Sequence, residues 1–186
     1  MNGNDEFKLY VVSLRYIEYL RQYEPTKILS SIGDHYVHDR KYLGIVYSIG
    51  GYNFFAPFSS PKNSDYTKVK GERKIRKSIV PIIRMTETKS DGSELLLGTI
   101  KLNNMIPVPE TELTLYDVDN ESDLHYKILI QKEIQFVRKN KEKIFRNAGI
   151  LYKQRINNMP GIGYLQSTAD FALLQKKYDE FVDNQN

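Results

Sequence analysis

A pair of glycines between two short apolar runs constrains the fold more than any other feature, in the stretch 43–62 (LGIVYSIGGYNFFAPFSSPK). Two glycines in this setting are a strong signal for a β-hairpin with a two-residue turn. With Gly50 and Gly51 as the turn, all four facing pairs are apolar and share one face of the hairpin. The expected pairs are Ile49 with Tyr52, Tyr47 with Phe54, Ile45 with Ala56 and Leu43 with Phe58. A slip of one residue would expose all of these side chains, so the pattern predicts a hairpin with one buried face.

The second strand of this hairpin leads into the segment Ser59-Ser60-Pro61-Lys62. Pro61 biases Ser60 toward an extended backbone, so two hydroxyls and one ammonium leave a rigid strand on a short, stiff exit. Such an exit can hold chemistry. The alternative is plain, because Ser and Pro after a strand usually form only a turn.

Other segments predict further strands, joined mainly by hairpins. The expected strands are 9–12, 79–85, 95–102 and 112–118. Asp91 and Gly92 supply the turn before 95–102, and Pro81 favours an edge position or a bulge for 79–85. Hairpin connections predict an antiparallel sheet of five or six strands.

Three helices complete the pattern. Ser13 is placed to cap a first helix, Ser122 or Asp123 to open a long second one, and Ser167 with Asp170 to form a capping box for the last. Their apolar positions are Ile17 and Leu20, then Ile130, Ile134, Val137 and Ile144, then Phe171, Leu174, Tyr178 and Phe181. At 186 residues, the chain is most simply one α+β domain spanning residues 1–186.

Positive charge is concentrated beside the serine exit. Residues 61–89 contain nine Lys or Arg and three acidic residues and carry +6, so the rest of the chain sums to −2. A concentrated positive segment is the footprint of a protein that binds polyanions. The alternative is a solvated loop. The part from Asn63 to Lys77 lacks a hydrophobic period, and we expect it to be mobile.

Several classes of site are disfavoured by the residues. The chain has no cysteine, which excludes disulfides, a thiol nucleophile and cysteine metal sites. Histidines at 35, 38 and 125 would make at most a thin metal site, and the motifs of phosphate loops, nucleophile elbows and dinucleotide sites are missing. No apolar run approaches the roughly 18 residues of a membrane span, and the N-terminus does not resemble a signal peptide. We therefore expect a soluble, cytoplasmic protein with no metal or other cofactor and no membrane partner.

A polar loop at 30–40 precedes the central hairpin and carries Tyr36 between His35 and His38. Loops before rigid elements often hold functional side chains, although a solvated connection is an equal alternative.

Four blocks of the sequence resemble the ToxN/AbiQ family, the endoribonuclease toxins of type III toxin–antitoxin systems. The most specific is GIVYSIGGYNFFAPFSSPK, with its Ala-Pro-x-Ser-Ser-Pro-Lys exit. The others are the opening Tyr10…Arg15-Tyr16-Ile17-x-Tyr19-Leu20, the run Ile100-Lys101-Leu102-x-x-Met105-Ile106-Pro107, and Gln135-Phe136-Val137-Arg138 with Lys143-Ile144. The resemblance covers nearly the whole chain, but the basic segment and the Asp91-Gly92 region match loosely.

This resemblance implies a compact, strongly twisted antiparallel sheet surrounded by helices. It implies metal-independent RNA cleavage that leaves a 2′,3′-cyclic phosphate and a 5′-hydroxyl. The implied partner is a small folded repeat RNA antitoxin, which the toxin processes and which then inhibits it in a closed protein–RNA ring. Cellular mRNA would be the substrate when the antitoxin runs short, DNA would not be a partner, and the role would be phage abortive infection or plasmid maintenance.

Carried over by the resemblance, the catalytic site falls on Ser60 and Lys62, with Ser59, Tyr36 and Tyr16 nearby. Lys62 would stabilise charge on the phosphate oxygens, and Ser60 would orient the attacking 2′-hydroxyl or relay its proton. Tyr36 or Tyr16 would hold the substrate or serve the leaving oxygen. The residues expected to bind RNA are Lys68, Lys70, Arg73, Lys74, Arg76, Lys77 and Arg138.

Two other functions fit the same residues. In a non-catalytic RNA-binding module, the Ser-Ser-Pro-Lys segment would only position a phosphate. A structural or protein-interaction domain with a basic loop is the second alternative.

Overall fold

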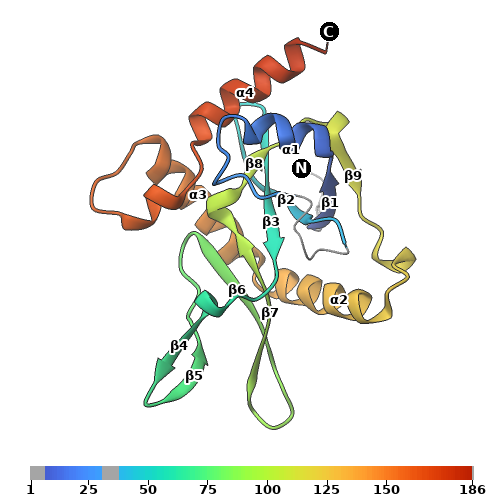
Figure 1. Ribbon diagram of the computed structural model, residues 1–186, viewed down its shortest axis with the longest axis vertical. Coiled ribbons are helices and arrows are strands. Elements are labelled where there is room, and N and C mark those ends of the chain that lie inside the picture. The colour runs from blue at the N-terminus through green and yellow to red at the C-terminus, as the bar shows by residue number, and fades with distance from the viewer. Residues whose placement is uncertain (1–6, 31–37, 186) are drawn as a thin grey trace.

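An antiparallel sheet forms the centre of the structure, a computed structural model that describes residues 7–30 and 38–185 (Figure 1). Within these residues the sheet has seven strands in the order β6-β7-β3-β2-β1-β9, and β8 also pairs with β3. The strands are β1 Lys8–Val12, β2 Lys41–Ile49, β3 Tyr52–Ser59, β6 Ile82–Thr88, β7 Glu94–Lys101, β8 Ile106–Pro107 and β9 Leu113–Leu115. The predicted α+β class with an antiparallel sheet is confirmed.

Four α-helices pack around this sheet: α1 Leu14–Arg21, α2 Leu124–Lys139, α3 Lys141–Ile156 and α4 Phe171–Asp183. Helix α2 lies against β6 and β7, α3 against β2, and α4 against β8. Short 3₁₀ helices occur at Asn63–Asp65, Leu102–Asn104, Glu110–Glu112, Val118–Asn120 and Gly163–Ser167. No helix in the described part of the chain has the length and apolar character needed to cross a bilayer.

The central hairpin forms, but its register agrees with the prediction only near the turn. Ile49 pairs with Tyr52 and Tyr47 with Phe54, as predicted. The other two predicted pairs are wrong, because Leu43 pairs with Ala56 and the register shifts between Leu43 and Tyr47. This bulge places three residues of β2, 44–46, opposite one residue of β3, and it redirects the side chains that follow. Ile45 is consequently 39% exposed.

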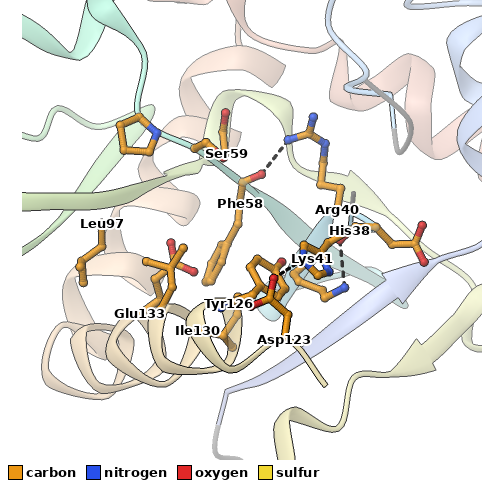
Figure 2. Close-up of a pocket in the computed structure, with 14 residues that line it drawn as sticks. His38, Arg40, Lys41, Phe58, Ser59, Leu97, Asp123, Tyr126, Ile130 and Glu133 are labelled. Atoms are coloured by element: carbon orange, nitrogen blue, oxygen red, sulfur yellow. Dashed lines mark hydrogen bonds and ion pairs between the residues drawn. The ribbon is translucent and has the colours of Figure 1, made fainter. Parts of the chain in front are cut away.

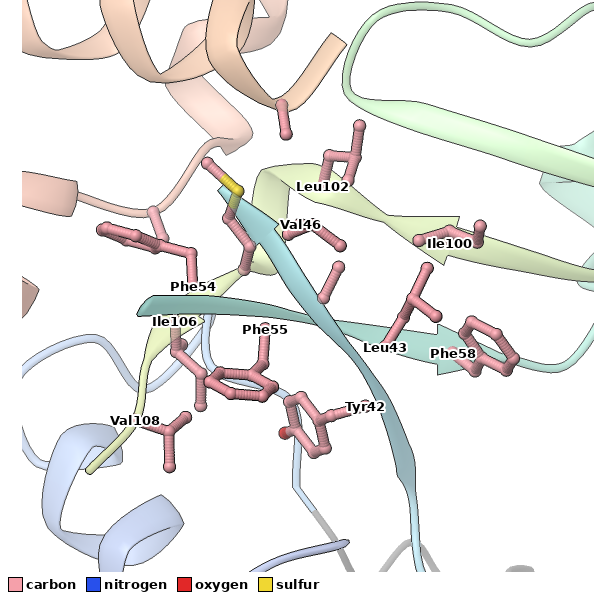
Figure 3. Close-up of a cluster of buried hydrophobic side chains, with 14 of the residues drawn as sticks. Tyr42, Leu43, Val46, Phe54, Phe55, Phe58, Ile100, Leu102, Ile106 and Val108 are labelled. Carbon is pink, nitrogen blue, oxygen red and sulfur yellow. The ribbon is translucent and has the colours of Figure 1, made fainter. Parts of the chain in front are cut away.

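Strand β3 is buried on both faces, whereas the sequence pattern predicted one. Phe54 packs edge-on against Tyr152 of α3 and Phe171 of α4. Its neighbour Phe55 points the other way, to Tyr10 of β1. Figure 3 shows Phe54 and Phe55 within one apolar cluster together with side chains from β2, β7 and β8. Strand β3 is thus a central strand covered on both sides, and its end is held firmly.

The predicted long helix is in fact two helices. Asp123 caps α2 by accepting hydrogen bonds from the backbone N–H groups of His125 and Tyr126. The helix ends at Asn140, whose side-chain amide donates to the carbonyl of Phe136 at 2.9 Å. Asparagine competes in this way with helix hydrogen bonds, so α3 begins anew at Lys141 and carries the buried Ile144.

Part of the basic segment forms regular structure that the sequence pattern did not predict. It folds as a two-stranded hairpin, β4 Tyr66–Val69 and β5 Glu72–Ile75, around a turn at Lys70 and Gly71, both with positive φ. The Arg73 guanidinium lies 3.7 Å from the ring centre of Tyr66. We call residues 66–75 the basic arm; in Figure 1 it projects from the end of the molecule opposite the C-terminus.

Element boundaries differ from the prediction at three places. Strand β6 begins after Pro81, at one edge of the sheet, and the predicted strand at 112–118 shortens to β9. Asp170 alone caps α4 through the N–H of Leu173. Ser167 lies in a 3₁₀ helix, so the predicted capping box is wrong.

Gly44 lies where β2 and β3, the two strands of the central hairpin, approach each other closely. A Cβ atom at this position would overlap the ring of Phe55, and overpacking of this kind costs about 1–3 kcal/mol. We expect Gly44→Ala to lower the free energy of unfolding in urea by that amount. At Gly163 a Cβ would meet no atom within 4 Å, so Gly163→Ala should change it by less than about 0.5 kcal/mol. Equal effects of the two changes would contradict the close approach.

Candidate active site

A cavity of about 330 Å³ lies where β3 ends, β2 begins and α2 passes beneath them (Figure 2). Phe58, Leu97, Tyr126, Leu129 and Ile130 form its apolar walls. Its polar lining comprises His38, Asp39, Arg40, Lys41, Ser59, Ser60, Asp123 and Glu133. An apolar cavity with a few converging polar groups is the usual form of a ligand or active site.

The serine exit predicted from sequence lies at this cavity. Ser59 is the last residue of β3 and is buried, and its carbonyl accepts a hydrogen bond from Thr99 of β7. Ser60 is exposed and lines the cavity. Lys62 is also exposed, two residues further along, and it lies outside the set of residues that line the cavity. The structure therefore brings both serines to the cavity and leaves the lysine beside it.

Two cations that were not predicted as site residues line the same cavity. Arg40 donates to the carbonyls of Phe58 at 2.8 Å and Ser30 at 2.9 Å. Lys41 is buried, donates to the carbonyl of Asp39, and lies 4.2 Å from the ring centre of Tyr116. Burial lowers the pKa of Lys41 below its ordinary value. Positive groups next to hydroxyls suit a phosphate better than a neutral ligand.

His38 also lies at the cavity. Its ring stacks on Tyr126 with the two ring centres 3.9 Å apart and the planes nearly parallel. Its Nε2 lies 3.3 Å from the carboxylate of Asp123, so the capping residue of α2 also orients this imidazole. His35 lies outside the described residues.

Glu133 is the most unusual group in the cavity. It is 5% exposed, and among the described residues no hydrogen bond or ion pair to its carboxyl is found. Burial raises its pKa from an ordinary 4.5 to about 8. The sequence already indicated that this acid is buried, because position 133 falls on the same helical face as Ile130 and Val137. A lone acid within an apolar stripe is a candidate functional group.

Two other predicted catalytic residues are not found at this cavity. Tyr16 belongs to the core: its side chain is fully buried and its hydroxyl donates to the carbonyl of Pro107 at 2.7 Å. A ring sealed in this way cannot contact a substrate, so its prediction as a site residue is corrected. Tyr36 lies outside the described residues.

The cations predicted to bind RNA fall on two surfaces. Lys68, Lys70, Arg73, Lys74, Arg76 and Lys77 lie on the basic arm and at its root, where their side chains are exposed. Lys74 forms an ion pair with Glu72 at 2.6 Å within the arm. Arg138 is exposed near the end of α2. Across residues 7–30 and 38–185, no cluster of three or more His, Asp and Glu side chains is arranged to hold a metal ion.

Comparison with known proteins gives a consistent result. A family model described as toxin ToxN of type III toxin–antitoxin systems matches residues 8–179. The chain is 32% identical over 174 residues to the endoribonuclease ToxN of Pectobacterium atrosepticum, covering 94% of this chain and 93% of that protein. It is 28% identical over 173 residues to the endoribonuclease AbiQ of Lactococcus lactis subsp. lactis, covering 91% and 86%.

Solved structures agree with these sequence matches. A structure from work on a bacterial antiviral system regulated by a processed non-coding RNA has a TM-score of 0.75 and 30% identity, and the match covers 93% of this chain and 98% of the other. The structure of AbiQ, a lactococcal anti-phage endoribonuclease, has a TM-score of 0.76 at 23% identity, covering 95% and 98%. The second match supports the fold alone.

The raised pKa of Glu133 predicts a pH dependence of stability. Between pH 4.5 and about 8 the unfolded chain has lost this proton while the folded chain keeps it, so stability falls as pH rises through this window. Glu133→Gln keeps the shape of the side chain but removes the group that titrates. As the pH rises through this window, we expect the stability of the variant relative to wild type to increase by up to about 1.4 kcal/mol per pH unit.

The measurement is urea unfolding of both proteins at pH 5, 6, 7 and 8, and the exposed Glu142→Gln controls for loss of one formal charge. A difference between wild type and Glu133→Gln that does not change with pH would contradict a neutral buried carboxyl.

Proposed function

The chain belongs to the ToxN family of toxins of type III toxin–antitoxin systems, and from this premise we propose that it is an endoribonuclease inhibited by a non-coding RNA antitoxin. The observation that carries the proposal is the position of Ser60, which lines a cavity that also holds Arg40 and Lys41, with Lys62 two residues away. A hydroxyl at the end of a rigid strand thus shares one cavity with two cations, and a third follows two residues later. A phosphodiester is the ligand that such a group fits best.

The proposed reaction is attack by a ribose 2′-hydroxyl on the adjacent phosphorus. The bond from phosphorus to the 5′-oxygen breaks, and the products are a 2′,3′-cyclic phosphate and a 5′-hydroxyl. One proton leaves the 2′-oxygen and another must reach the departing 5′-oxygen. The reaction needs no metal ion, because lysine and arginine side chains can stabilise the charge on the phosphate oxygens.

Each side chain has a role suited to its chemistry. Lys62, with Arg40 as a second cation, would stabilise the phosphate oxygens, and Ser60 with Ser59 would orient the attacking hydroxyl. An unperturbed serine is a weak base near neutral pH. Glu133, with a pKa of about 8, is suited to exchanging a proton at physiological pH. Tyr36 stays a candidate for holding the substrate, on the family resemblance.

The proposed partners follow from the same chemistry. The toxin would process a repeat-containing antitoxin RNA, be held inactive by the folded units in a cyclic protein–RNA assembly, and cut cellular mRNA in the cytoplasm when the antitoxin is depleted. DNA lacks the attacking 2′-hydroxyl and would not be cleaved. Phage abortive infection or plasmid maintenance would be the biological role; the 30% identical structure from work on a bacterial antiviral system supports the former.

The basic arm and Arg138 are proposed to bind the RNA backbone. The arm's cations are exposed on a hairpin that stands away from the main sheet (Figure 1). Arg73 also stacks on Tyr66, which offers a flat surface to an unpaired base. The arm would thus hold RNA without contributing to the chemical step.

Removing Ser60 or Lys62 should abolish cleavage without unfolding the protein. By analogy with the loss of one oxyanion donor, Lys62→Ala should slow cleavage by about 10²–10³-fold, or 2.7–4 kcal/mol, and both variants should lose growth inhibition. Ser64→Ala and Lys89→Ala, both at exposed positions, are the matched controls. The readout is single-turnover cleavage of an RNA with analysis of the product ends.

Equal cleavage by wild type and both variants would end the assignment of these two residues. Tight RNA binding with no cleavage by the wild type, and no cyclic phosphate ends, would instead support the non-catalytic RNA-binding module.

Charge on the arm and at its root should control RNA affinity and its salt dependence. The double variant Lys68→Gln, Lys77→Gln should lower affinity and reduce the slope of log affinity against log salt by about 0.7 for each single-strand phosphate that is no longer neutralised. Lys153→Gln with Lys176→Gln removes the same charge from α3 and α4 and should have a smaller effect. Affinity titrations at several salt concentrations measure both quantities. If the two double variants behave alike, the arm is not the RNA-binding surface.

A further inference from the structure

A buried ion pair lies next to the backbone of Lys62, the proposed catalytic lysine. The side chains of Asp65 and Arg84 are only 2% and 7% exposed. Two nitrogens of Arg84, Nε and Nη2, each lie 3.1 Å from Oδ1 of Asp65. Neither residue lines the cavity, and the proposed reaction does not use them.

The second oxygen of Asp65 holds the backbone of Lys62. Oδ2 accepts a hydrogen bond from the N–H of Lys62 at 3.0 Å. In return the N–H of Asp65 donates to the carbonyl of Lys62 at 2.9 Å. Both backbone polar groups of Lys62 are therefore fixed by one residue, although the side chain itself is exposed.

The same pair also holds the root of the basic arm. The carbonyl of Asp65 accepts from the N–H of Arg76 at 2.8 Å. Arg84 donates through Nη1 to the carbonyl of Lys77, and its own N–H donates to the hydroxyl of Ser78, both at 2.8 Å. The segment 76–78, which follows β5, is thus hydrogen-bonded to Arg84 and to Asp65, and Asp65 also fixes the backbone of Lys62.

The electrostatic surroundings explain why the carboxylate is needed. Lys101, at the end of β7, is half-buried; its pKa is lowered mainly by burial, with Lys62 and Arg84 lowering it further and Asp65 opposing them. Asp65 therefore offsets part of the mutual repulsion among three neighbouring cations. Buried ion pairs seldom stabilise a fold more than apolar residues would, and their better-supported use is to specify one geometry.

We propose that Asp65 and Arg84 are a positioning pair that joins Lys62 and the root of the basic arm into one rigid unit. RNA held on the arm would then meet the Lys62 ammonium in a fixed register. The proposal rests on the proposed function for its catalytic consequence. It predicts that breaking the pair slows the chemical step while RNA still binds.

The central experiment compares single-turnover cleavage at saturating RNA with RNA affinity. For Asp65→Asn we expect the cleavage rate to fall about 10²-fold, the size of effect that a misplacement of about 1 Å can cause, while the dissociation constant changes less than about twofold. Arg84→Lys keeps the charge but cannot form both bonds to Asp65, and should slow cleavage in the same way but by less. Arg155→Met removes an ion pair between Arg155 and Asp170, remote from the cavity, and should leave the rate unchanged.

Amide hydrogen exchange gives a readout that does not depend on activity. The Asp65 carboxylate accepts from the amide of Lys62, whereas the amide of Arg76 donates to the backbone carbonyl of Asp65. In Asp65→Asn we expect the Lys62 amide to exchange about tenfold faster because its carboxylate acceptor is removed, and the Arg76 amide to exchange faster because the ion pair that holds its backbone acceptor is broken. We expect no such change in Arg155→Met. If the wild type does not cleave RNA, the proposed function fails, but these amides still test the positioning pair.

Three results would overturn the proposal. They are an unchanged cleavage rate in folded Asp65→Asn, a loss confined to RNA affinity, and unchanged exchange at Lys62 and Arg76. If Asp65→Asn does not fold, Arg84→Lys decides by the same measurements, and a wild-type rate and wild-type exchange in that variant would reject the pair.

Discussion

The burial of β3 on both faces is the constraint on which the rest of the structure depends. This strand pairs with β2, β7 and β8 and packs aromatic rings against α3 and α4 on one face and β1 on the other. Its backbone cannot shift without disturbing all of these neighbours. The two serines at its end therefore leave the core at a fixed place and in a fixed direction. Rigidity of this kind is what catalysis by orientation requires.

Local patterns predicted the elements well, and long-range packing decided what they could not predict. The Gly50-Gly51 turn, the Ser13 cap and the Asp91-Gly92 hairpin each depend on a few adjacent residues, and all three form. The bulge in β2 depends on its packing against β3. The helix break at Asn140 involves one local side-chain bond to Phe136, which the apolar pattern of the helix does not reveal. The basic arm was missed because its strands have four residues each and no apolar alternation.

The candidate site, too, could be predicted from the sequence only in part. Ser59 and Ser60 could be found because they form a continuous motif at a strand end. Arg40, Lys41 and Glu133 come from the start of β2 and the middle of α2, and only the folded chain brings them to the serines. Tyr16 is an instructive error, since a motif residue can match a family for reasons of packing alone. Its hydroxyl bond to Pro107 ties α1 to β8, which is a structural role.

Under the proposed function, the distribution of charge separates the residues that would hold RNA from those that would cut it. The arm's cations are exposed, where salt would screen them and where they would contribute mainly nonspecific affinity. The cavity instead combines a buried lysine of lowered pKa with a buried carboxyl of raised pKa, so burial moves both groups toward neutrality. With a pKa of about 8, Glu133 can exchange a proton near physiological pH, which an ordinary exposed glutamate does not. In a chain without cysteine, burial is thus the means by which ordinary side chains acquire acid–base chemistry. The role proposed for the arm would require no burial, because binding a phosphate requires only a permanent positive charge.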